Sequence, residues 1–179
     1  MPAATQEISE ALIRHNINRA VCDVFKTMLH RTASLGAAYS PGAADPHPNG
    51  LPCDPTSSTP QVVGTVGFLG DANGLIYLYF DGNFARSCTG HLLGMTDAEV
   101  DEAGDEVIND AIGEITNMTV GSFKNGLADQ GYPCKLTIPS ILRGRNFCVE
   151  PISDSQRFIY VFETEGQRLV ADILLKCGE

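Results

Sequence analysis

The chain has 179 residues, a formal net charge of −10 at pH 7 and a pI near 4.7. The negative charge argues against nucleic acid as a partner, because such binding depends on clustered lysine and arginine side chains. The N-terminus lacks a basic start followed by an apolar run, and no stretch of about 18 apolar residues occurs, so we expect a cytoplasmic protein without membrane contact.

The first half of the sequence predicts a helix, a loop and a hairpin. Apolar residues recur every three or four positions from Ile8 to Met28, which is typical of an amphipathic helix, and we place this helix at about residues 5–30. The proline-rich stretch at about 41–60 is expected to be a loop inserted in a single domain that covers residues 1–179. Two β-rich runs, 61–70 and 74–81, meet at an Asn-Gly dipeptide, which is a strong signal for an antiparallel hairpin.

The second half predicts two helices followed by strands. Residues 82–93 can form a short helix, and a long helix is expected from Thr96 to about Asp129, opened by the capping-box spacing of Thr96 and Glu99. Strand patterns follow at 134–142, 157–164 and 167–176, with a second hairpin turn at Glu165-Gly166. These elements predict an α+β fold, in which long helices pack on a largely antiparallel twisted sheet.

The cysteines and histidines do not form a metal-binding pattern. None of the six cysteines is part of a Cys-x-x-Cys pair, and the four histidines are scattered without ligand spacing. We therefore expect no metal site, and thiols that are reduced and mostly buried. The cysteines are Cys22, Cys53, Cys88, Cys134, Cys148 and Cys177.

The long helix predicted at 96–129 has two distinct faces. Asp110, Glu114 and Asn117 are separated by four and three residues, so they fall on one polar stripe. Gly121 continues this stripe, and Gly113 is expected near it on the exposed side, where a glycine would allow another protein to approach closely. The opposite face is expected to pack on the core and carries Ile108, Ala111, Ile112, Ile115, Met118 and Thr119.

This stripe carries a resemblance to a known family. The pattern of Asp110, Glu114 and Asn117 inside DAIGEITNM, followed by Pro139, resembles the signature of the CheC, CheX and FliY phosphatases. The order of the predicted elements outside residues 41–60 is also similar to that family. The first helix has no Glu-x-x-Asn motif, and a chain with a single motif is more similar to CheX than to CheC.

The resemblance implies a function and a partner. A chain of this type is expected to form a homodimer and to dephosphorylate the phospho-aspartate of a CheY-like receiver domain. Glu114 would pair with a receiver lysine, and Asn117 would orient the attacking water. Because the receiver supplies the phosphate and a Mg²⁺ ion, the enzyme would need no cofactor of its own.

Two alternatives remain open at this point. A second pair with the same spacing, Glu106 and Asn109, is also expected on the exposed side, and helix geometry alone does not choose between the pairs. The preceding Asp110 and the GEITNM context favour Glu114 and Asn117. The same fold could also act as a non-catalytic module that binds a receiver, or as a structural dimerisation module.

Overall fold

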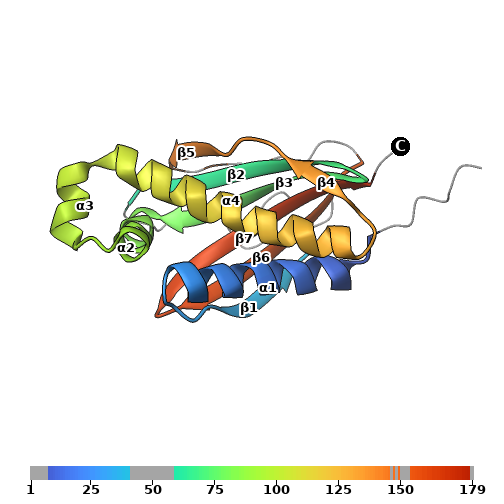
Figure 1. Cartoon of the computed structure of the whole chain (residues 1–179), viewed down its shortest axis with the longest axis horizontal. Coiled ribbons are helices and arrows are strands. Elements are labelled where there is room, and N and C mark those ends of the chain that lie inside the picture. The colour runs from blue at the N-terminus through green and yellow to red at the C-terminus, as the bar shows by residue number, and fades with distance from the viewer. Residues whose placement is uncertain (1–7, 41–58, 146, 148, 150–153, 178–179) are drawn as a thin grey trace, which may run out of the picture.

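The computed structural model describes residues 8–40, 59–145, 147, 149 and 154–177. It has an α+β architecture in which helices cover one face of a single antiparallel sheet (Figure 1). The fold class predicted from the sequence is therefore confirmed. Of the proline-rich stretch, only Thr59 and Pro60 fall within the described residues.

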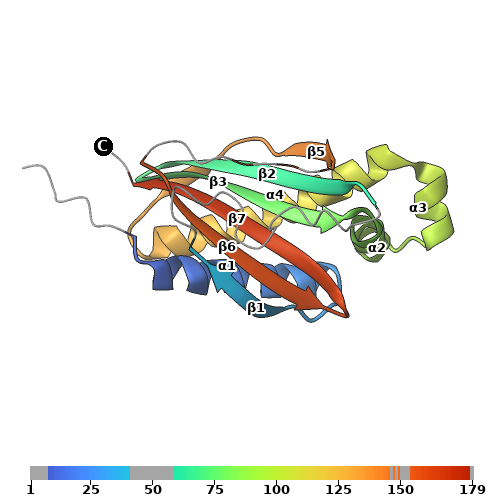
Figure 2. The same cartoon turned by 180° about the vertical axis from the view of Figure 1, so that it is seen from behind.

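Within the described residues the sheet has seven strands, and every pairing among them is antiparallel. Its order is β1-β6-β7-β3-β2, and both β4 and β5 pair with the far side of β2. Seen from behind, the long strands twist across the molecule (Figure 2). The strands are β1 (Ser34–Tyr39), β2 (Gln61–Gly70), β3 (Ala72–Asp81), β4 (Cys134–Leu136), β5 (Ser140–Gly144), β6 (Gln156–Thr164) and β7 (Gln167–Cys177).

Both predicted hairpins are confirmed. In the first, Phe68 of β2 is opposite Gly74 of β3, and the Asn73 side chain accepts a hydrogen bond from the Gly70 amide at 3.1 Å. In the second, Thr164 is opposite Gln167 across the turn at Glu165-Gly166. The first chain reversal is at Asp71, two residues before the predicted Asn73-Gly74, which lies in β3. The two hairpins together pair four of the strands.

The sequence prediction is wrong for one strand and missed another. The single strand expected at 134–142 is divided into β4 and β5 by residues 137–139, and both parts pair with β2. The edge strand β1 was not predicted. Its sequence, SLGAAY, is short and rich in small residues, so it has little of the β-branched or aromatic character that marks a strand.

The N-terminal helix, α1 (Glu10–Met28), agrees with the prediction apart from its ends. Ser9 caps it, and the Ser9 hydroxyl accepts a hydrogen bond from the Leu12 amide at 3.3 Å. A short helix, α2 (Gly82–Leu93), follows β3 directly and matches the predicted range. Asp81 caps α2 by accepting a hydrogen bond from the Asn83 amide at 2.9 Å.

The long helix predicted from Thr96 to Asp129 is in fact two helices, α3 (Asp97–Ala103) and α4 (Asp105–Asp129). They separate at Gly104, whose φ of 84° lies outside the range of a right-handed helix and is readily adopted only by glycine. The predicted capping box of Thr96 and Glu99 is confirmed, and it opens α3. The pattern located the helix start correctly but did not reveal the break.

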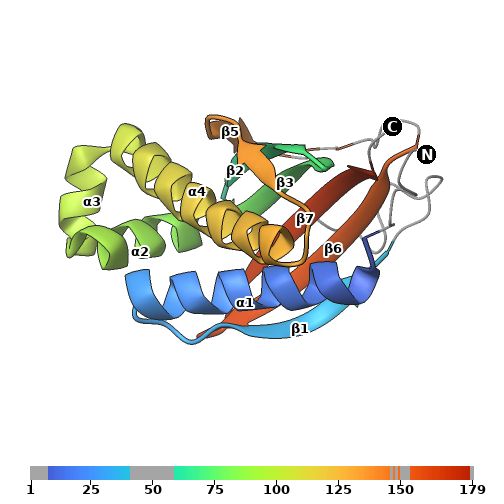
Figure 3. The ribbon, with the colours of Figure 1, turned by 45° about the vertical axis from the view of Figure 1, so that its right-hand side comes forward.

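Helix α4 packs tightly on the sheet and on α1, and the two helices lie side by side over the sheet (Figure 3). Gly64 of β2 leaves room for the buried Thr116, since a Cβ at Gly64 would overlap the Thr116 hydroxyl. On the α1 side, Gly126 is in close contact with the buried Asn16, and a Cβ there would overlap the Asn16 amide. These glycines fix the height and the rotation of α4 on the sheet.

Candidate active site

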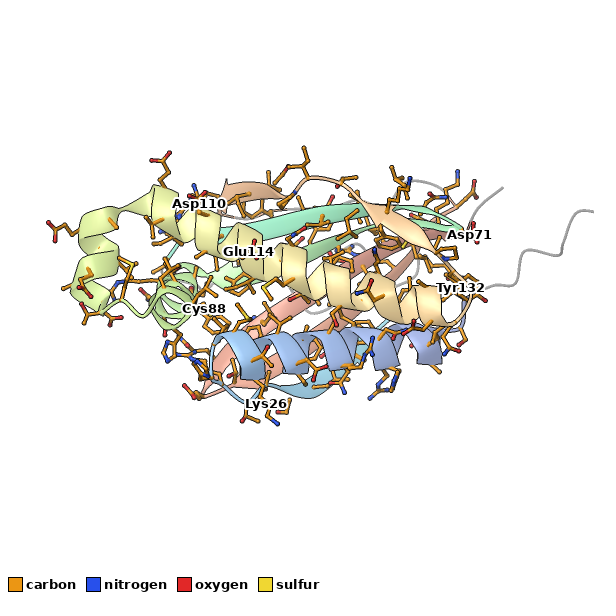
Figure 4. All side chains as sticks on the ribbon, viewed as in Figure 1. Lys26, Asp71, Cys88, Asp110, Glu114 and Tyr132 are labelled. Carbon is orange, nitrogen blue, oxygen red and sulfur yellow. The ribbon has the colours of Figure 1, made fainter. Side chains whose placement is uncertain are left out.

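The predicted polar stripe lies on the face of α4 that is turned away from the sheet. Asp110 and Glu114 are exposed and Asn117 is half-buried. Figure 4 labels Asp110 and Glu114 on the outer side of this helix. The predicted core residues behind them are buried, except Met118, which is half-buried against the core. The helix periodicity therefore assigned the two faces correctly for these side chains.

Glu114 and Asn117 have no partner within the part of the chain that the structure describes. Neither side chain forms a hydrogen bond or an ion pair there, although both lie on a long helix fixed by buried contacts. A carboxylate and a carboxamide are thus held one helical turn apart with their polar atoms available. The pair can bind a cation through Glu114 and orient a water molecule through Asn117.

The second Glu-x-x-Asn pair is in a different environment. The Asn109 side chain accepts a hydrogen bond from the Arg143 guanidinium of β5, with an Nε–Oδ1 distance of 2.5 Å. Arg143 also forms an ion pair with Asp105 at 3.4 Å and donates to the Asp105 backbone carbonyl at 3.2 Å. The amide of this pair is therefore occupied within its own chain. The structure thus distinguishes two pairs that helix geometry alone could not separate.

The prediction that Gly113 lies on the exposed side is wrong. Gly113 is buried, and a Cβ at this position would lie 3.9 Å from the Cδ1 atom of Ile141 in β5. Gly113 is three residues before Thr116, so it is rotated from the polar stripe toward β5. Gly121 is half-exposed, as expected for the end of the stripe, and a Cβ there would lie 3.8 Å from the Leu136 Cδ1 atom.

Two residues near the stripe were missed by the sequence analysis. Arg143 holds the first turns of α4 against β5, but its long separation from Asn109 leaves no local signal. Ile138 lies between β4 and β5 and is 87% exposed. The strand pattern had placed Ile138 inside a continuous strand, and its exposure becomes visible only because β4 ends at Leu136.

The described cysteine, histidine and acidic side chains outside the stripe do not form a metal-binding cluster. No group of three or more histidine, cysteine, aspartate or glutamate residues that could hold a metal ion is found among the described residues. Cys22, Cys88 and Cys134 are free thiols, and burial raises the pKa of the Cys88 thiol to about 12. None of the described helices is long and apolar enough to span a membrane.

A comparison with known families identifies a match that includes the stripe. A family model described as chemotaxis phosphatase CheX matches residues 62–163, which is more than half of the chain. This range includes all of α4 and the segment between β4 and β5. Among curated proteins, none matches the sequence.

Solved structures share the fold. The chemotaxis protein CheX from Desulfovibrio desulfuricans has a TM-score of 0.71 and 22% identity, over 92% of this chain and 99% of that chain. A CheC-like superfamily protein from Shewanella has a TM-score of 0.74 and 22% identity, over 94% and 99%. A CheX–CheY–BeF3–Mg²⁺ complex from Borrelia burgdorferi has a TM-score of 0.69 and 20% identity, over 92% and 97%.

Proposed function

Because the chain belongs to the CheX chemotaxis phosphatase family, we propose that it hydrolyses the aspartyl phosphate of a CheY-like receiver domain. The observation that carries this proposal is the unpartnered pair of Glu114 and Asn117 on the outer face of α4. The similar structure from Borrelia burgdorferi is a complex with CheY, in which BeF3 stands in for a phosphoryl group. This complex supports a receiver domain as the partner.

In the proposed reaction, α4 docks over the phosphoaspartate of the receiver. The Glu114 carboxylate pairs with a receiver lysine and so sets the position of the helix. The Asn117 amide enters the receiver site, where it can both donate a hydrogen bond to a water molecule and accept one from it. Asparagine does not titrate, so this role does not depend on pH near neutrality.

The chemistry requires no covalent step on this chain. The water oxygen forms a bond to phosphorus while the bond between phosphorus and the aspartate oxygen breaks, which releases inorganic phosphate and restores the aspartate carboxylate. Phosphoryl transfer depends mainly on in-line positioning and on charge stabilisation. The receiver's own Mg²⁺ stabilises the charge, and Asn117 contributes the position of the water.

The half-buried setting of Asn117 suits this role. A residue on a helix fixed by buried packing loses little conformational freedom when the complex forms. Thr116 and Thr119 on either side of it are buried, and each hydroxyl donates to the backbone carbonyl four residues earlier, at 2.7 and 2.8 Å. The backbone that carries Asn117 is therefore fixed before the receiver binds.

Phosphate release provides the direct test. The chain is mixed with a phosphorylated CheY-like receiver from the same organism, and inorganic phosphate is followed over time. We expect the wild-type chain to release phosphate faster than the receiver does alone. With Asn117→Ala the rate should fall to that of the receiver alone. With Glu114→Ala a higher concentration of the chain should be needed to reach the same rate of release. Binding without any acceleration would contradict catalysis and indicate a non-catalytic receiver-binding module.

We also propose, from the family resemblance, that two copies of this cytoplasmic chain form a homodimer. The sheet ends in β1, whose outer edge has no strand partner among the described residues. Light scattering on the purified chain should give twice the monomer mass. A monomer at micromolar concentration would contradict this proposal and would leave the phosphatase assignment unchanged.

A further inference from the structure

The segment that joins β4 to β5 runs along α4 beside the polar stripe. Leu136, at the end of β4, approaches Gly121, and Ile141, in β5, approaches Gly113. The two glycines are one helical turn before and one turn after Asn117. Residues 138 and 139 lie between these two contacts, so the structure places them at the level of Asn117.

This segment is fixed at its base. The Thr137 amide donates to the Gly67 carbonyl at 2.8 Å, and the Gly67 amide donates to the Thr137 hydroxyl at 2.9 Å. Two residues after Thr137 is Pro139, whose ring fixes its own φ. Between these constraints Ile138 is 87% exposed, whereas the other exposed large apolar residues reach at most 58%.

We propose that Ile138 is an apolar anchor that packs against the receiver domain when α4 docks on it. This inference rests on the proposed function, because it takes its partner from the stripe that it adjoins. Apolar contacts around a polar centre exclude water and strengthen the hydrogen bonds inside. Ile138 contributes such a contact on the β4–β5 side of Asn117, and so contributes to the affinity for the receiver rather than to the chemical step.

The position of Ile138 favours the receiver over a second copy of this chain. A copy seated on Ile138 would also cover Glu114 and Asn117, which lie along the same segment of α4. The receiver, in contrast, has to approach this surface for Asn117 to reach its phosphoryl group. The anchor is thus continuous with the surface that the reaction uses.

The test measures binding and turnover separately. The probe is the host's CheY-like receiver, loaded with beryllofluoride and Mg²⁺, and the chain is titrated against it by calorimetry. For Ile138→Ser we expect about tenfold weaker binding, which corresponds to about 1.4 kcal/mol. In the phosphate-release assay, the half-saturating receiver concentration should rise by a similar factor, and the maximal rate should stay unchanged.

Leu69→Ser provides the matched control. Leu69 is 58% exposed on β2 and is opposite Lys135, away from α4. We expect the Leu69→Ser variant to bind the receiver with wild-type affinity and to release phosphate at wild-type rates. Ile138→Leu should keep the affinity within about twofold, since an apolar side chain is retained. Both Ile138 variants should unfold at the wild-type temperature, because residue 138 is outside the core.

The possible outcomes separate the two proposals. Wild-type affinity for Ile138→Ser, or a fall in its maximal rate with unchanged affinity, would overturn the anchor. Binding that depends on Ile138 but is not followed by hydrolysis would support the anchor and reject the phosphatase assignment. A wild-type chain that neither binds nor dephosphorylates the receiver would reject both.

Discussion

Helix α4 carries two Glu-x-x-Asn pairs, and their environments differ. At the start of the helix, Asn109 accepts a hydrogen bond from Arg143, and the neighbouring Asp105 forms an ion pair with the same arginine. Two turns later, Glu114 and Asn117 have no partner among the described residues. Asn109 and Asp105 thus join the start of the helix to β5, whereas the second pair is available to another molecule.

The difference shows that spacing alone does not make a site. Both pairs have the same separation on the same helix, so local geometry presents them in the same way. A single tertiary contact, from a residue 34 positions later in the sequence, occupies the amide of one pair. The following predictions test this contrast, from the largest expected effect to the smallest.

The contrast predicts first that the two asparagines differ in their effect on catalysis. Asn117→Ala removes the group that we propose orients water, and we expect the maximal rate of dephosphorylation to fall about 100-fold, which corresponds to about 2.7 kcal/mol. Asn109→Ala should leave that rate unchanged, because Asn109 is bound to Arg143. Equal losses in both variants would show that the rate reports helix stability instead of water positioning.

Substitution of Glu114 should also affect the reaction more than substitution of Glu106, but the difference should be smaller than that between the two asparagines. Glu114→Gln keeps the size of the side chain and removes the charge that, in the proposed function, pairs with a receiver lysine. We expect about a tenfold rise in the half-saturating receiver concentration, and the difference from wild type should shrink at high salt. Glu106→Gln is the control and should change this concentration less than twofold. A loss independent of ionic strength would contradict the ion-pair role.

A third prediction concerns the arginine that occupies Asn109. Arg143→Ala breaks a partly exposed ion pair and two hydrogen bonds, and we expect the free energy of unfolding to decrease by about 1 kcal/mol in chemical denaturation. The maximal rate of dephosphorylation should stay at the wild-type value, because the freed Asn109 is two turns from Asn117. A higher rate would indicate that the first pair can act once it is released.

The placement of the candidate stripe on α4 could be predicted because it depends on one local rule. Residues three and four positions apart share a helix face, so the pattern placed Asp110, Glu114 and Asn117 on the exposed side of α4. The two hairpins were predictable for a similar reason, since turn-forming residues at 71–74 and at Glu165-Gly166 interrupt the strand patterns, although Asn73-Gly74 itself lies in β3. In each case the information lies within a few residues of the feature it determines.

The missed features depend on contacts between distant segments. Gly104 allows α3 and α4 to separate, but glycine also occurs inside α4, so its identity did not predict a break. Gly113 faces β5 because Thr116 seats against Gly64 and so fixes the rotation of the helix. Ile138 is exposed because β4 ends early. None of these contacts produces a periodic pattern in the sequence.

The smallest predicted effect distinguishes the two glycines that flank Asn117. Gly113→Ala should raise the free energy of unfolding by about 0.5 kcal/mol, since alanine restricts the unfolded chain and the added methyl group would be in ordinary contact with Ile141. Gly113 faces β5, so the half-saturating receiver concentration should stay unchanged.

The matched variant Gly121→Ala should stabilise the chain similarly, since its methyl group would also be in ordinary contact, with Leu136. Gly121 is half-exposed at the end of the stripe, so there the methyl group would reach the surface on which we propose that the receiver docks. We therefore expect about a twofold rise in the half-saturating concentration for Gly121→Ala only. If Gly113→Ala weakened the receiver complex instead, the receiver would have to contact the β5 side of α4, and the docking surface would extend toward Arg143.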